Sequence, residues 1–251
     1  MANGCIAVGR ILDKLDGYLH KKDYAAAERH LAFWAEEARV AEDIKTLLLV
    51  LNEQMGLYRK TGKREQATIA ARDAISVIER KGLGELVGAA TAFLNAATVY
   101  KAFGMAEEAI PLFAQARQVY ERELEQDDDR LAGLYNNMGL AFVDVGRFDE
   151  ANALYEKALT IMEKKEKGAA DAAVTHLNMA SLAEARLGLE AAEAAVAACL
   201  ARARTLLDGV EQRDGNYAFV CEKCASVFGY YGYFRYENEL KERARRIYEG
   251  S

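Results

Sequence analysis

Two cysteines three residues apart are the side chains best suited to chemistry in this sequence. They lie in the segment Cys221-Glu222-Lys223-Cys224, where the spacing places both thiols on one face of a helix. A zinc site needs two further ligands, yet there is no second such pair, and the three histidines lack ligand spacing. A thioredoxin-like role requires a strand context that this sequence does not predict. We interpret both cysteines as apolar core residues, with redox and metal roles as the alternatives, and expect no cofactor.

No other pattern in the sequence predicts catalysis. It contains no glycine-rich phosphate loop, no HExxH and no GxSxG motif. The run Asp127-Asp128-Asp129 lacks the further oxygens and the glycine of a calcium loop, so it is interpreted as the N-cap of a helix. We therefore expect a protein that is not an enzyme.

Composition favours an acidic, helical protein. The 251 residues include 33 Lys and Arg against 39 Asp and Glu, a net charge of −6, and a single proline, which favours long uninterrupted helices. The acidic balance gives no electrostatic footprint for nucleic acid. The longest strongly apolar run, residues 47–51, is too short to span a membrane. The N-terminus does not resemble a secretory signal, so we expect a cytoplasmic protein that binds neither nucleic acid nor membrane.

A repeat of about 42 residues organises the chain. Glycines separated by 42 residues occupy one slot of the repeat, a further glycine follows 44 residues later, and a lysine holds the slot in the first repeat: Lys22, Gly62, Gly104, Gly146, Gly188 and Gly232. Five of the six repeats have an aromatic residue four positions before the slot, and four have alanine five positions after it. Glycine ends one helix because it adopts a left-handed φ without strain, and the alanines let a second helix pack closely against the first.

The repeat predicts an all-α solenoid of six helix pairs, stacked because one pair cannot bury its apolar faces alone. The repeats are expected at residues 5–40, 44–80, 84–124, 130–165, 169–207 and 215–249. Their helices are expected at 5–20 with 23–40, 44–60 with 64–80, 84–103 with 106–124, 130–145 with 148–165, 169–187 with 190–207, and 215–230 with 234–249. The loops at 80–85 and 126–130 are too short to be domain linkers, so we expect one domain over residues 1–251. Pro111 falls about one turn into a second helix.

The segment YNNMGLAFVDVGRFDEANALYEKALTI, residues 135–161, resembles a tetratricopeptide repeat. The usual unit has 34 residues, and the longer unit with EEAxPLF at 107–113 is similar to the repeats of kinesin light chains and related bacterial proteins. The first repeat and the last two depart most from the pattern, as terminal repeats often do. This resemblance implies a right-handed superhelical solenoid whose concave face holds an extended peptide.

The resemblance also implies which side chains face that concave surface. By register, asparagines hold one position of the first helices at Asn52, Asn136 and Asn178, and the next position at Asn95 and Asn137. An amide can pair with both N–H and C=O of a peptide; the alternative is that these amides bond neighbouring helices or water. Basic residues follow one to two turns later at Arg59, Lys60, Lys101 and Arg186. In the trough they would select acidic segments, although complementing the helix dipole explains them as well.

The C-terminal run from Tyr230 to Tyr236 contains five aromatic residues. Buried rings at a tight turn are the favoured interpretation, and an exposed patch for self-association is the alternative.

The sequence as a whole leaves two candidate functions. The first is a non-catalytic scaffold that binds an extended peptide segment of another protein in its groove. The second is a structural, self-associating protein, such as a homodimer, that uses its aromatic end or its convex face.

Overall fold

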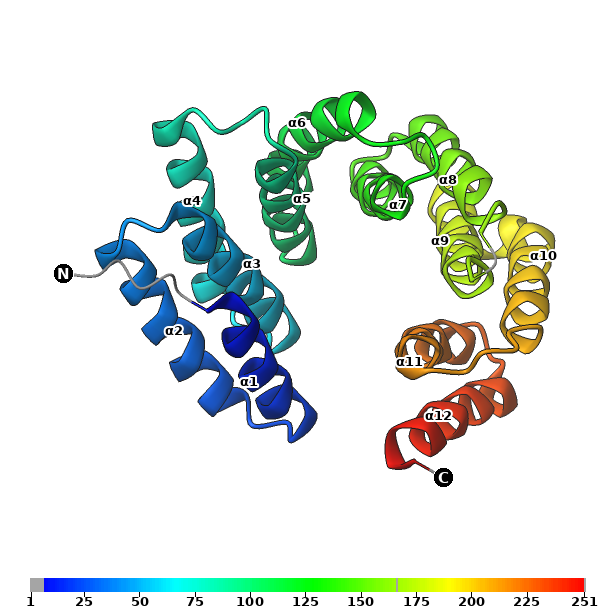
Figure 1. Cartoon of the computed structure of the whole chain (residues 1–251). Coiled ribbons are helices and arrows are strands. Elements are labelled where there is room, and N and C mark those ends of the chain that lie inside the picture. Colours follow the sequence, from blue (N-terminus) through cyan, green and yellow to red (C-terminus); the bar gives the residue numbers. More distant parts are fainter. Residues whose placement is uncertain (1–6, 166, 251) are drawn as a thin grey trace. The chain divides into compact units, whose positions relative to one another are not determined.

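The computed structural model describes residues 7–165 and 167–250, which form twelve α-helices and no strand (Figure 1). The first two residues of the expected helix 5–20, one of which is Cys5, lie outside the described residues. The helices are α1 (Val8–His20), α2 (Tyr24–Val40), α3 (Ile44–Lys60), α4 (Arg64–Lys81), α5 (Val87–Ala102), α6 (Ala106–Glu123), α7 (Asp129–Asp144), α8 (Phe148–Met162), α9 (Ala169–Leu187), α10 (Leu189–Asp208), α11 (Gly215–Tyr230) and α12 (Phe234–Glu249). The predicted all-α fold of six helix pairs is therefore confirmed.

The helix boundaries agree with the repeat to within three residues. Four helices, α3, α9, α11 and α12, begin and end at the expected residues. The largest differences are late starts of α1 and α5 and an early end of α8, each by three residues. Pro111 lies inside α6, in its second turn, as expected. No described helix is long and apolar enough to cross a membrane.

The helices pack into two compact units, Met1–Glu123 and Leu124–Ser251. In each unit, consecutive helices pair as hairpins, and the first helices of neighbouring hairpins also touch, as α3 touches α5 and α7 touches α9. We call these the N-terminal unit and the C-terminal unit. The expectation of one domain over residues 1–251 stays a prediction.

The turn inside the hairpin explains the repeated glycine. Gly62 has a φ of +71°, and the N–H of Lys63 then donates to the carbonyl oxygen of Tyr58 at 2.8 Å. This bond closes the end of the helix in the manner of a Schellman motif. Equivalent bonds to the residue four before the slot are donated by Asp23, Met105, Arg147 and Tyr233. Lys22 adopts the same conformation with a φ of +55°, although it carries a side chain.

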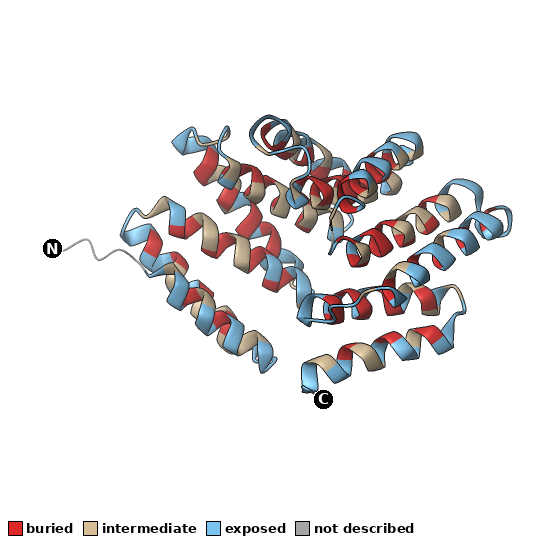
Figure 2. Ribbon diagram, turned by 45° about the vertical axis from the view of Figure 1, so that its right-hand side comes forward, coloured by how far each residue is buried: buried red, intermediate tan, exposed pale blue. Residues whose placement is uncertain are grey.

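Small residues allow the two helices of a hairpin to approach closely. Ala67, Ala109 and Ala151, five positions after the slot, are fully buried, and so are Ala74 and Ala116 seven positions later. Figure 2 shows buried residues along the facing sides of the helices and exposed residues on the outer sides. This packing fixes the orientation of the first helix of each hairpin, and the side of that helix that faces away from its partner forms a surface.

Candidate binding grooves

A groove of about 680 Å³ lies on the first helices of the N-terminal unit, between α3 and α5. Apolar side chains from α3 and from the loop before α5 line much of it: Leu48, Leu49, Leu83 and Leu86. Leu86 is 56% exposed, so an apolar side chain of the groove is in contact with water. We call this the leucine groove.

Two of the expected amides meet in the leucine groove. The Nδ2 of Asn95 on α5 donates to the Oδ1 of Asn52 on α3 at 3.1 Å. Both side chains are half-buried and line the groove. Because each amide has two N–H donors and an oxygen that accepts twice, this one bond leaves both residues able to bind a ligand.

Glu53 adds a negative charge to the same surface. Its carboxylate is half-buried and lines the groove beside Asn52. Burial raises the pKa of Glu53 above its ordinary value, and the nearby carboxylate of Asp16 on α1 raises it further. Across residues 7–165 and 167–250, no hydrogen bond or ion pair to the Glu53 carboxylate is found.

A second groove, of about 380 Å³, lies on α7, α9 and α11 of the C-terminal unit. It is lined by the other three expected asparagines and by three lysines, Lys165, Lys167 and Lys223, and we call it the lysine groove. Lys165 lies 3.7 Å from the carboxylates of both Asp127 and Asp129, so part of this positive charge is already paired.

The amides of the lysine groove bond mainly within the fold. The Nδ2 of Asn178 donates to the Oδ1 of Asn136 at 3.3 Å, and the Nδ2 of Asn136 donates to the Oγ1 of Thr175 at 2.8 Å. Asn137 donates to the carbonyl oxygen of Gly133, on its own helix, at 2.9 Å. The amides therefore join neighbouring first helices in both units, which is the alternative that the sequence left open.

The four expected basic residues do not line either groove. The Nη1 of Arg186 forms an ion pair with Asp149 at the start of α8, at 2.7 Å. The Nζ of Lys60 lies 5.8 Å from the ring centroid of Tyr24 at the start of α2. Arg59 is exposed on α3, and Lys101 is half-buried on α5. Arg186 and Lys60 thus contact the preceding hairpins.

The two cysteines of the CxxC segment are buried in the core of the C-terminal unit. Cys221 is fully buried and Cys224 is 1% exposed, and both thiols are free. Burial raises the pKa of Cys224 to about 12 and also raises the pKa of Cys221. Thiols with raised pKa values are poor nucleophiles near neutral pH. No cluster of metal-ligating side chains occurs in the part of the chain that the structure describes.

The aromatic C-terminal end differs from the favoured expectation. Tyr236 is 4% exposed, as expected, but Tyr230, Tyr233 and Phe234 are 69%, 40% and 64% exposed. The hydroxyls of Tyr230 and Tyr231 donate to Glu184 on α9, at 2.6 and 2.7 Å, and Tyr231 is half-buried against the core. The prediction that the rings are buried was wrong for three of the five, because these three lie at the turn of the hairpin, where equivalent residues of an inner repeat, Lys60 and Arg64, are exposed as well.

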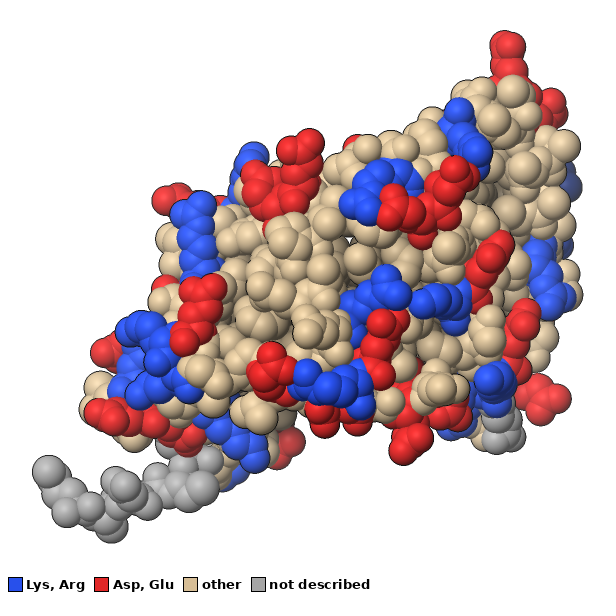
Figure 3. Space-filling model, turned by 90° about the horizontal axis from the view of Figure 1, so that it is seen from above, with Lys and Arg blue, Asp and Glu red and all other residues tan. Residues whose placement is uncertain are grey.

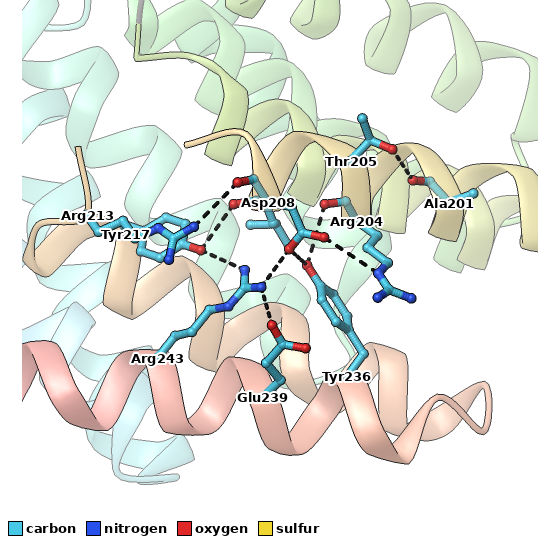
Figure 4. A network of polar contacts seen from close by, with 10 residues as sticks. Ala201, Arg204, Thr205, Asp208, Arg213, Tyr217, Tyr236, Glu239 and Arg243 are labelled. Atoms are coloured by element: carbon cyan, nitrogen blue, oxygen red, sulfur yellow. Dashed lines mark hydrogen bonds and ion pairs between the residues drawn. The ribbon is translucent and has the colours of Figure 1, made fainter. Parts of the chain in front are cut away.

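A polar network joins the last hairpin to α10 (Figure 4). Asp208 accepts from the hydroxyl of Tyr236 at 2.8 Å and from the Nη2 of Arg243 at 2.7 Å. The Nη1 of Arg243 donates to the hydroxyl of Tyr217 at 3.0 Å, and this hydroxyl donates to the carbonyl oxygen of Leu207 at 3.1 Å. Because each polar atom here has a partner on another helix, the network fixes the position of the terminal hairpin.

Sequence reasoning missed the residues that give the leucine groove its character. Leu83 and Leu86 lie in a connecting loop, where the repeat makes no prediction. Glu53 occupies the register position of Asn95 and Asn137, so a comparison of equivalent positions would have marked it as a groove residue.

Figure 3 shows Lys and Arg interspersed with Asp and Glu on the face it presents, without a continuous basic area.

Comparisons with known proteins agree with this geometry. Residues 88–164 match the family described as "Tetratricopeptide repeat". Over 142 residues, 55% of this chain, the sequence is 25% identical to the protein KINESIN LIGHT CHAIN-RELATED 1 of Arabidopsis thaliana. The matched region spans 23% of that relative's length.

Solved structures show the same fold. BtubC (BKLC) from P. vanneervenii is 24% identical, with a TM-score of 0.68 and 82% of each chain covered. A putative kinesin light chain from Podosopora anserina with nearly identical TPR-like repeats is 17% identical, with a TM-score of 0.54, over 80% of this chain and 94% of that one. A Rap protein complexed with competence and sporulation factor is 14% identical, with a TM-score of 0.54, over 94% of this chain and 73% of that one.

Proposed function

We propose that this chain, a repeat protein of the tetratricopeptide type, is a non-catalytic module that binds an extended segment of another protein in its grooves. The observation that carries the proposal is the amide pair of Asn52 and Asn95 among the half-buried and exposed leucines of the leucine groove. Amides of this kind bind the backbone of an extended peptide, and leucines bind its apolar side chains.

The balance of forces favours a peptide over a small molecule. The groove is open and shallow, so a ligand gains most by burying side chains against Leu48 and Leu86. Backbone hydrogen bonds to Asn52 and Asn95 replace bonds to water, and each contributes about 1 kcal/mol. An extended segment supplies both kinds of contact at once.

The lysine groove supports a second part of the proposal, that a partner segment is acidic. Its three lining lysines outnumber its two lining carboxylates, Asp129 and Asp171, and ammonium groups form charge-assisted hydrogen bonds with carboxylates. A cytoplasmic location is proposed together with this activity.

A peptide-display selection tests the leucine groove directly. Random ten-residue peptides are selected on the wild-type chain, and the affinities of synthetic copies are measured by fluorescence anisotropy. We expect the Asn52→Ala/Asn95→Ala variant to bind about 30-fold more weakly, because two hydrogen bonds are lost, and Leu86→Glu to abolish binding by placing a charge against apolar ligand side chains.

The matched control is Asn152→Ala. Asn152 is a half-buried asparagine on α8, outside both grooves, that bonds only Glu156 of its own helix among the described contacts. We expect its affinities to equal those of the wild type. Equal binding by all four proteins, with unchanged melting temperatures, would show that peptides do not use the leucine groove.

The exposed C-terminal rings favour self-association as a second candidate function. Tyr230 and Phe234 are 69% and 64% exposed, and such side chains mark contact surfaces when they cluster. Sedimentation velocity across the micromolar range should then show a dimer in the wild type that weakens in the Tyr230→Ser/Phe234→Ser variant. A wild-type protein that stays monomeric at all concentrations would reject this function.

A further inference from the structure

The leucine groove has a polarity that restricts its ligand. One end, at the N-termini of α3 and α5, is apolar through Leu48 and Leu86, whereas the other end carries Asn52 and Glu53. A charged group that is half-buried without a partner is costly, and no cation within the described residues forms an ion pair with Glu53. Asp16, whose charge raises the pKa of Glu53, is also negative. The groove therefore lacks a positive charge at this end.

The one cation that lines the groove does not fill this place. Lys45 lies eight residues before Glu53 on α3, which separates the two positions by roughly 12 Å along the helix axis. An ion pair needs a separation of about 4 Å or less between nitrogen and oxygen. Lys45 therefore leaves the position beside Glu53 open to a basic group of a ligand.

We propose that the ligand of the leucine groove is an extended segment with an aliphatic side chain at one end and a Lys or Arg about four residues away, which pairs with Glu53. The aliphatic side chain packs against Ile44 and Leu86 at the end of the groove, and the amides of Asn52 and Asn95 bind the backbone between the two anchors. The inference rests on the proposed function, because it assigns the ligand class of the same groove.

The length of the groove sets the spacing between the two anchors. Ile44 and Glu53 mark its ends on α3 and are separated by roughly 13 Å, at 1.5 Å per helical residue. An extended chain advances about 3.3 Å per residue, so about four residues span this length. A segment of another length places its basic residue away from the carboxylate.

Two synthetic peptides test the inference. The first is a fluorescein-labelled peptide selected on the wild-type chain that has a Leu and a Lys at this spacing, and the second has Glu in place of that Lys. We expect the wild type to bind the Lys peptide about tenfold more tightly, Glu53→Gln to bind both peptides alike, and Glu53→Lys to prefer the Glu peptide. Glu65→Gln, an exposed carboxylate in the first turn of α4, is the matched control and should retain the wild-type preference.

The outcomes separate this inference from the proposed function. If the wild type binds both peptides equally and Leu86→Glu abolishes both, the charge preference is wrong and the groove is still the binding site. If Leu86→Glu and the Glu53 variants change neither affinity, the inference and the leucine groove as the binding site are both overturned. Glu53→Gln preserves the shape of the side chain, so a Glu53→Lys variant that fails to fold does not prevent a decision.

Discussion

Tyr155 on α8 carries a buried hydroxyl that has no hydrogen-bond partner among the described residues. Its ring packs against Gly139 of α7 so closely that a Cβ at Gly139 would collide with it. An unpaired buried hydroxyl costs free energy that a phenyl ring does not. We expect Tyr155→Phe to raise the free energy of unfolding by about 1 kcal/mol in urea titrations.

Tyr120 is the matched control for this change. It is also buried, but its hydroxyl lies 2.7 Å from the Oγ1 of Thr91. Tyr120→Phe should therefore lower the free energy of unfolding by about 1 kcal/mol. A loss of stability for both variants would indicate that the Tyr155 hydroxyl has a partner in solution.

Lys22 offers a second test at the residue scale. It holds a left-handed φ of +55° in the slot that glycine occupies in the other repeats, and a side chain in this conformation costs about 1 kcal/mol. Lys22→Gly should raise the melting temperature of the chain, whereas Lys21→Gly, at a right-handed position with a φ of −79°, should lower it. Equal effects of the two substitutions would contradict the strain at Lys22.

Residue types alone did not determine the role of the asparagines. The register predicted that Asn52 and Asn136 lie on the inner sides of the first helices, and both line grooves. The register did not predict that Asn136 would be 9% exposed and bonded to Thr175. Hydrogen bonds between repeats depend on the distance between helices, which a repeat pattern does not contain.

At the scale of the element, the carboxylate of Asp128 makes the stability of the start of α7 depend on pH. Its carboxylate accepts from the backbone N–H of Arg130 at 2.9 Å and from the guanidinium of the same residue. The guanidinium lowers the pKa of Asp128 to about 2. Because the folded pKa is depressed, this stabilisation is present above the unfolded pKa, near 3.9, and is lost as the pH falls through about 2.

We expect Asp128→Ala to lower the free energy of unfolding by about 1 kcal/mol at pH 7, as loss of an N-cap does. The difference from the wild type should shrink between pH 4 and pH 2, which urea titrations at several pH values will measure. Asp127→Ala removes a neighbouring carboxylate that does not cap the helix and should show a smaller difference at pH 7. A difference for Asp128→Ala that is constant with pH would contradict the assignment.

Helices were predictable because their signals recur every 42 residues. The glycine slot and the buried alanines such as Ala67 and Ala109 repeat the same local physics in each hairpin. The leucine groove was not predictable in this way, since Leu83 and Leu86 belong to a loop that varies between repeats. The specificity of the leucine groove therefore depends on a loop whose sequence does not follow the 42-residue repeat.

At the scale of the whole molecule, contacts between neighbouring helices determine how far a local loss of stability extends along the chain. Within each unit, helices touch mainly the other helix of their hairpin and the helices of the next hairpin, so a local defect should open nearby helices before distant ones. Arg243 is suited to test this, because it joins α12 to Asp208 at the end of α10 and to Tyr217 on α11. Arg243→Leu should destabilise the terminal hairpin by about 2 kcal/mol, since it removes the two hydrogen bonds that join α12 to Asp208 and Tyr217.

Native-state hydrogen exchange measures where that loss appears. We expect amide exchange in α11 and α12 to rise about 30-fold, the equivalent of about 2 kcal/mol, while exchange in α1 to α4 stays at the wild-type rate. Arg245→Leu, which removes an exposed ion pair with Glu242, should leave exchange in all helices nearly unchanged. If Arg243→Leu instead raises exchange equally in α1 to α4, residues 1–251 open as one cooperative domain, and stability is shared along the chain more widely than contacts between neighbours imply.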